Sequence, residues 1–129
     1  MDYNMKVKFY VCERCGNQID MVYDSGVNPV CCGQKMKLLE AGVVEASHEK
    51  HIPVVKVEDG IVKVSVGEVE HPMSEEHSIE WIVLETDRGV QRKYLAKGEA
   101  PYAEFRISDE KPVAVYAYCN LHGLWRSDV

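Results

Sequence analysis

Short runs of apolar and β-branched residues, separated by turn residues, recur along most of the chain. They are residues 6–11, 54–57, 61–66, 79–86, 90–95, 102–107 and 113–118. The first run alternates roughly between polar and apolar side chains, as a short strand does. Asp59-Gly60 and Asp87-Arg88-Gly89 each separate two runs and suit tight hairpin turns. The pattern predicts strands throughout and no convincing helix.

These strands indicate an all-β protein of two parts. The segment Met36-Lys37-Leu38-Leu39 ends the first part, and Glu40-Ala41-Gly42 resembles a short linker. We therefore expect a small N-terminal module over residues 1–38 and a second domain over residues 39–129. Short strands with turns over roughly 90 residues predict an antiparallel, immunoglobulin-like sandwich. Trp81 and Phe105 are expected in its core.

The composition describes a soluble globular chain and excludes several classes of partner. The 129 residues, 46% hydrophobic and 28% charged, suffice for one ordinary domain and a very small one. A net charge of -6 argues against nucleic acid as the main partner, because phosphate binding needs a basic surface. No export signal and no apolar run of roughly 20 residues is present, so we expect a cytoplasmic protein that is not bound to membranes.

The five cysteines favour metal binding over disulfides. Their number is odd, and four of them lie between residues 12 and 32. Cys12-x-x-Cys15-Gly16 is typical of a metal knuckle, and Cys31-Cys32 supplies two further thiolates if the backbone bends there with the help of Gly33. We expect a distorted tetrahedral site that the small module needs in order to fold. Thiolates suit zinc and iron alike, so the spacing leaves the metal open.

A second set of ligands lies in the rest of the chain. Cys119-x-x-His122 follows the run 113–118, where the backbone must turn. Further histidines fall at expected strand ends or in loops, namely His51, His71 and His77. Each of these histidines alone would ordinarily be a solvated loop residue, and His48, which lies outside the set, is interpreted as a solvated strand or linker residue. His51, His71, His77 and His122 together with Cys119 offer five nitrogen and sulfur ligands, which exceeds the usual four of zinc and favours iron with an open sixth position.

Several motifs are highly specific in combination. They are Cys12-x-x-Cys15 with Cys31-Cys32, Glu49-Lys50-His51-x-Pro53, His71-Pro72-Met73, His77-x-x-Glu80-Trp81 and Cys119-Asn120-Leu121-His122-Gly123. With them the chain resembles desulfoferrodoxin, the two-iron form of superoxide reductase, from end to end. The resemblance implies a desulforedoxin-like N-terminal iron module followed by an immunoglobulin-like sandwich. Because its first four cysteines are intact, the chain does not resemble the one-iron members.

The resemblance also implies the cofactors and the reaction. It assigns one iron to Cys12, Cys15, Cys31 and Cys32, and a catalytic iron to His51, His71, His77 and His122 with Cys119 as axial ligand. It implies one-electron reduction of superoxide to hydrogen peroxide in oxidative-stress defence, a rubredoxin-like electron donor and a homodimer. Lys50 would steer superoxide and order the water that supplies protons, and Glu49 would occupy the sixth position of the oxidised iron. The closed four-cysteine site would act as an electron relay or as a structural stabiliser.

Two readings from other classes compete with this one. The first is a non-enzymatic protein in which both irons only pass electrons, and the second is a zinc-stabilised interaction module. The open position and Lys50 favour the enzyme over the carrier, and the five-ligand set disfavours zinc. A dismutase is a closer chemical rival, but it would also have to oxidise superoxide.

Overall fold

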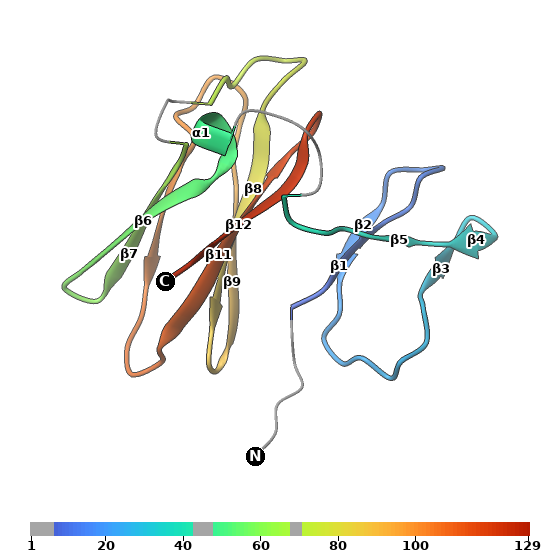
Figure 1. The fold of residues 1–129 in the computed structure, drawn as a ribbon, viewed down its shortest axis with the longest axis horizontal. Coiled ribbons are helices and arrows are strands. Elements are labelled where there is room, and N and C mark those ends of the chain that lie inside the picture. Colours follow the sequence, from blue (N-terminus) through green and yellow to red (C-terminus); the bar gives the residue numbers. More distant parts are fainter. Residues whose placement is uncertain (1–6, 43–47, 68–70) are drawn as a thin grey trace. The chain divides into compact units, whose positions relative to one another are not determined.

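The computed structural model describes residues 7–42, 48–67 and 71–129, apart from the side chains of His48 and Glu49. The chain forms two compact units, Met1–Leu39 and Glu40–Val129 (Figure 1). This division falls next to the boundary expected after residue 38. Within the described ranges, no helix has the length and hydropathy needed to cross a membrane.

The described part of the first unit, residues 7–39, contains five very short strands. β1 (Phe9–Val11), β2 (Gln18–Asp20) and β5 (Lys37–Leu38) form an antiparallel sheet in the order β2-β1-β5, and β3 (Val30–Cys31) pairs with β4 (Gln34–Lys35). One buried cluster in the described part of this unit consists of Tyr10, Cys12 and Met36, with Met21 and Cys31 packed against it, and Phe9 is also buried. So small an apolar core provides little stabilisation by itself.

The second unit is a sandwich of two antiparallel sheets, with strand orders β10-β7-β6 and β12-β11-β8-β9. The strands are β6 (Pro53–Glu58), β7 (Ile61–Val66), β8 (Ile79–Thr86), β9 (Gly89–Tyr94), β10 (Tyr102–Arg106), β11 (Pro112–Cys119) and β12 (Gly123–Asp128). The prediction of an all-β fold is confirmed.

Both expected hairpins are present, and their turns explain their register. Glu58 pairs with Ile61, so Asp59 and Gly60 form a two-residue turn in which both have positive φ, 50° and 73°. Such primed turns match the twist of the flanking strands. In the second hairpin Thr86 pairs with Gly89, and the Arg88 N–H donates to the Thr86 hydroxyl at 3.1 Å.

Besides the short strands β2 to β5 of the first unit, two elements of the second unit were not predicted. β12 occupies what the sequence indicated as a terminal loop, and it pairs with β11 through Tyr118↔Leu124 and Cys119↔Gly123. The second is α1 (His48–His51), a single helical turn at the end of the sandwich where β6 begins (Figure 1). A four-residue helix has too few positions to show a periodic pattern. Both elements carry or adjoin residues of the site described below.

The core lies between the two sheets. Phe105 is fully buried there as predicted, among Val62, Val64, Ile82 and other apolar side chains of both sheets. Trp81 is also buried, but strand alternation turns it away from the Ile82 side of β8. It stacks on Tyr118 with ring centroids 5.4 Å apart and planes 9° from parallel. Cys119 belongs to the core cluster, so its sulfur is enclosed by packed strands.

Candidate metal centres

The sulfur atoms of the first unit converge on one point. The four ligand atoms of Cys12, Cys15, Cys31 and Cys32 lie within 4.8 Å of one another. Two sulfur pairs are 3.6 and 3.9 Å apart, Cys15 with Cys31 and Cys31 with Cys32. Four sulfurs bound to one ion at about 2.3 Å in a tetrahedron lie about 3.8 Å apart, so these spacings fit a metal.

The backbone around Cys31-Cys32 makes this convergence possible. Adjacent residues of a regular strand point to opposite faces. Here β3 ends at Cys31, and Cys32 and Gly33 follow with φ of 55° and 75°. Two consecutive left-handed residues reverse the chain, and both neighbouring sulfurs thereby reach the same site.

The close packing of these thiols also shifts their pKa values. The backbone N–H of Cys15 approaches Cys12 Sγ at 3.5 Å and lowers the pKa of Cys12 to about 6. The neighbouring sulfur of Cys15, with those of Cys12 and Cys31, raises the pKa of Cys32 to about 12. The four sulfurs therefore cannot all be thiolates at neutral pH without a positive ion among them.

The second unit brings together four histidines and one cysteine from distant segments. His51 ends α1, His71 and His77 precede β8, Cys119 ends β11 and His122 lies just before β12. The ligand atoms of His51, His77, Cys119 and His122 lie within 4.8 Å of one another. His71 joins them, because its Nε2 lies 3.0 Å from His51 Nε2. His122 faces the same place through Nδ1, at 3.1 Å from His51 Nε2 and 3.9 Å from Cys119 Sγ.

Several atoms of this cluster have lone pairs directed at the common centre. His71 Nδ1 lies 2.7 Å from the Pro72 carbonyl, which only accepts, so Nδ1 carries the hydrogen and Nε2 faces His51 as a lone pair. Burial lowers the pKa of His71 to about 4, so its ring is neutral at physiological pH. His77 Nε2 is buried and has no hydrogen-bond partner in the described part of the chain. A metal ion would satisfy all of these nitrogens.

Burial also acts on the single sulfur of this cluster. It raises the pKa of the Cys119 thiol, while the backbone N–H groups of Leu121 and His122 act in the opposite direction. Cys119 therefore needs a nearby cation to ionise fully at neutral pH. Its N–H donors are placed to moderate the charge of the resulting thiolate.

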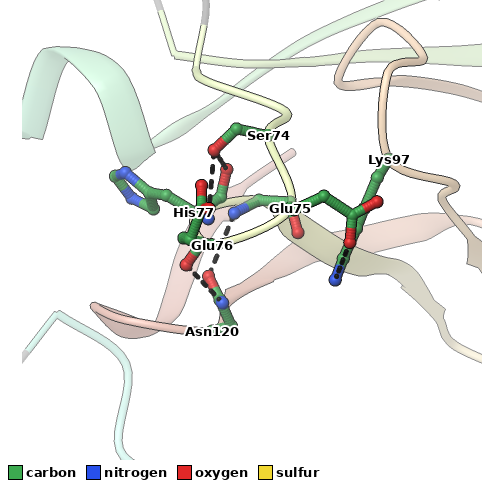
Figure 2. Close-up of polar contacts among 7 residues, drawn as sticks. Ser74, Glu75, Glu76, His77, Lys97 and Asn120 are labelled. Carbon is green, nitrogen blue, oxygen red and sulfur yellow. Dashed lines mark hydrogen bonds and ion pairs between the residues drawn. The ribbon is translucent and has the colours of Figure 1, made fainter.

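Two supporting residues were not singled out from the sequence. Trp125 is buried on β12, stacks on His51 with ring centroids 5.0 Å apart, and donates from Nε1 to the His122 carbonyl at 3.1 Å. Asn120 joins the turn after Cys119 to the loop that holds His77 (Figure 2). The available signal was position alone, since Asn120 lies inside the C-x-x-H motif and Trp125 three residues after it.

Of the two expected catalytic residues, the structure describes the side chain of Lys50 only. Lys50 is exposed on α1 next to His51. The pKa of His77 is lowered by burial, by His122 and by the charge of Lys50, so the Lys50 ammonium acts electrostatically on the site. The side chains of Glu49 and of His48 lie outside the described part of the structure.

Comparisons with known proteins agree with this geometry. Residues 43–128 match the family model described as Desulfoferrodoxin. The chain is 46% identical to the desulfoferrodoxin homolog of Archaeoglobus fulgidus over 94% of this chain and 96% of the relative. It is 45% identical to the desulfoferrodoxin of Nitratidesulfovibrio vulgaris, over 94% and 95%.

Solved structures of superoxide reductases are also similar to this chain. The crystal structure of the superoxide reductase from Treponema pallidum matches with a TM-score of 0.81 and 36% identity, over 95% of this chain and 99% of that one. The superoxide reductase (1Fe-SOR) of Giardia intestinalis matches with a TM-score of 0.55 and 34% identity, over 63% of this chain and 97% of that one.

Proposed function

The chain belongs to the desulfoferrodoxin family, and from this membership we propose that it is a superoxide reductase. Each turnover adds one electron and two protons to superoxide and releases hydrogen peroxide. One observation carries the proposal: four imidazoles and one thiol face a common centre, and the buried His77 Nε2 lacks any other partner in the described chain. When bound there, iron supplies one-electron redox chemistry.

We assign the two groups of ligands to two irons. Cys12, Cys15, Cys31 and Cys32 hold the first, and His51, His71, His77, His122 and Cys119 hold the second. Four neutral imidazoles and one thiolate leave a ferrous ion with a net positive charge, which attracts an anion to a chain of net charge -6. Five protein ligands would leave one coordination position of the iron open for that anion.

Lys50 acts at the entrance to the second site. Its exposed ammonium adds to the positive potential that attracts superoxide, and it can hold the water molecule that delivers protons to the reduced oxygen. Glu49 is assigned, from family resemblance, as the carboxylate that takes the sixth position in the oxidised resting protein. Both residues belong to the turn that ends in His51, so they are carried by the same backbone as a metal ligand.

The first unit serves electron transfer or stability, because four thiolates leave no position for superoxide. Since each turnover consumes an electron, we propose a small rubredoxin-like redox protein as donor. We also propose a homodimer and a cytoplasmic location. The dimer is supported by apolar side chains that the first unit leaves mostly exposed, Val22, Tyr23 and Val27. The location is supported by the five cysteines, none of which forms a disulfide bond.

The activity is tested on the iron-loaded chain, reduced and mixed with superoxide in a pulse-radiolysis or stopped-flow experiment. A reductase forms one hydrogen peroxide per superoxide and no oxygen, whereas a dismutase releases one oxygen for every two superoxide ions. If the reduced second iron is not oxidised by superoxide but exchanges electrons with a rubredoxin, the protein is an electron carrier and the proposal is wrong.

The role of Lys50 is tested by Lys50→Ala, with Lys56→Ala as the control. Lys56 is an exposed lysine of β6 that pairs with Glu58. Lys56→Ala changes the net charge of the chain by the same amount as Lys50→Ala. Lys50→Ala should slow the reaction with superoxide about 10-fold and flatten its dependence on ionic strength, with unchanged iron content. Equal rates for wild type and Lys50→Ala would remove Lys50 from the mechanism.

A further inference from the structure

Asn120 uses its whole side chain to connect two segments of the second metal site. Its Oδ1 accepts a hydrogen bond from the Ser78 N–H at 3.0 Å. Its Nδ2 donates to the Glu76 carbonyl at 2.9 Å (Figure 2). Its own backbone N–H donates to the Ser78 carbonyl at 3.2 Å. The partners are the residues immediately before and after His77, so three hydrogen bonds bracket that histidine.

We propose that Asn120 is a positioning residue for the second iron: it locks the His77 loop to the strand end that carries Cys119. Asn120 follows Cys119 directly, and its side-chain partners lie 42 and 44 residues away in sequence. The three bonds therefore set the distance between one imidazole ligand and the thiolate ligand. This inference rests on the proposed iron site.

The other hydrogen bonds of the His77 loop lie within it or reach the 95–100 segment, where the Gly98 N–H donates to the Met73 carbonyl at 2.8 Å. The Ser74 N–H donates to the His77 carbonyl at 2.9 Å, and the His77 N–H donates to the Ser74 hydroxyl at 3.2 Å. These bonds shape the turn without attaching it to β11. The ion pair of Glu75 with Lys97, at 3.3 Å, also links the loop to another segment (Figure 2). Both side chains are substantially exposed, and exposed ion pairs contribute little stabilisation.

The position of His77 must be accurate for the metal to bind. Ligand distances in metal sites vary by only about 0.2 Å. The buried Nε2 of His77 has no partner in the described chain that could correct a displaced ring. A loop that moves by a fraction of an ångström would therefore weaken this ligand, although the fold would persist.

The chemistry of the contact favours asparagine specifically. The site presents one donor, the Ser78 N–H, and one acceptor, the Glu76 carbonyl, to a single side chain. Aspartate has the same shape but would place an oxygen against the carbonyl, so it keeps one bond and loses the other. Alanine loses both. The two variants should therefore form a graded series.

The test compares Asn120→Ala, Asn120→Asp and wild type as full-length, iron-loaded chains. In a challenge with a chelator, Asn120→Ala should release iron from the His/Cys site 10- to 100-fold faster than wild type, and Asn120→Asp should fall between them. The sulfur-to-iron absorption and the electron paramagnetic resonance signal of that iron should change. The signals of the four-cysteine iron in the same chain should stay constant.

Two controls separate positioning from loss of stability. Lys97→Ala removes the exposed ion pair of the same loop and should leave release and spectra unchanged. Val64→Ala removes apolar atoms from β7, in the other sheet, and should lower thermal stability without changing the spectrum of the His/Cys iron.

The inference is overturned if Asn120→Ala keeps wild-type spectra and iron release, or if Val64→Ala reproduces its spectral change. Wild-type protein that takes up no iron at the His/Cys cluster would instead overturn the proposed function.

Discussion

The indole of Trp125 should be needed to keep iron in the second site, beyond its part in packing. Trp125 is 1% exposed, lies over His51 with ring centroids 5.0 Å apart and planes at 28°, and donates to the His122 carbonyl at 3.1 Å. It thus contacts one ligand through its ring and restrains another through its N–H. Trp125→Phe preserves an aromatic ring but removes the donor and part of the buried volume.

The cost of Trp125→Phe can be worked out from these contacts. A partly buried carbonyl that loses its donor costs about 1 to 3 kcal/mol. The missing ring atoms remove the equivalent of one or two buried methylenes, or about 1 to 2 kcal/mol. The sum, about 2 to 5 kcal/mol, is a large share of the roughly 5 to 15 kcal/mol that stabilises a typical domain. Loss of a partner that orients a ligand should also weaken iron binding about 10- to 100-fold.

Trp81→Phe is the matched control, because Trp81 is buried in the same sheet but stacks on Tyr118 instead of a histidine. Unfolding is followed by far-ultraviolet circular dichroism in urea, and iron release by absorbance in the presence of a chelator. We expect both variants to be destabilised, and only Trp125→Phe to lose iron faster from the His/Cys site. Equal iron release from the two variants would show that the indole only packs, and would refute the reasoning.

Two further predictions concern protons and electrons. Burial lowers the pKa of His71 to about 4 from 6.5, so below pH 6.5 the unfolded chain binds a proton that the folded chain does not. In the iron-free protein, the contribution of His71 to the free energy of unfolding should be fully present above pH 6.5 and should fall by up to about 3 kcal/mol between pH 6.5 and 4. Urea midpoints measured across this range report the change. His71→Gln should make the free energy of unfolding depend less on pH. Asn17 donates from Nδ2 to Cys31 Sγ at 3.7 Å. Asn17→Ala should therefore lower the reduction potential of the four-cysteine iron by about 40 mV for each 1 kcal/mol of hydrogen-bond stabilisation that is lost. Asn28→Ala, which removes an amide bonded to the Pro29 and Met36 carbonyls, should leave that potential unchanged in the same voltammetry.

The sequence was informative where a local rule applies. Asp59-Gly60 predicts a two-residue hairpin turn because both positions need positive φ, and the structure has that turn. Cys12-x-x-Cys15 and Cys119-x-x-His122 predict convergent ligands because two intervening residues allow both side chains to reach one ion. These inferences need no knowledge of distant parts of the chain.

The missed features depend on contacts that no local pattern contains. Asn120 matters because of Glu76 and Ser78, more than 40 residues away in sequence. Trp125 matters because β12 pairs with β11 and brings its ring over His51. β12 itself was missed because it follows Cys119 after a very short turn, in a segment that the sequence indicated as a loop around His122. Tertiary pairing decided its conformation.

The two metal sites differ in what holds their ligands, and this difference bears on their roles. In the second unit, Cys119 pairs with Ile79 on one side and Gly123 on the other, and its sulfur belongs to the core between two sheets. The strand ladder therefore positions this ligand before any metal arrives. In the first unit, Cys31 ends a two-residue strand and Cys12 is one of three residues in the buried cluster described there. We infer that the first metal stabilises its unit, whether or not it also relays electrons, whereas the second binds to a site that the sandwich positions, where chemistry can be tuned by neighbours such as Trp125.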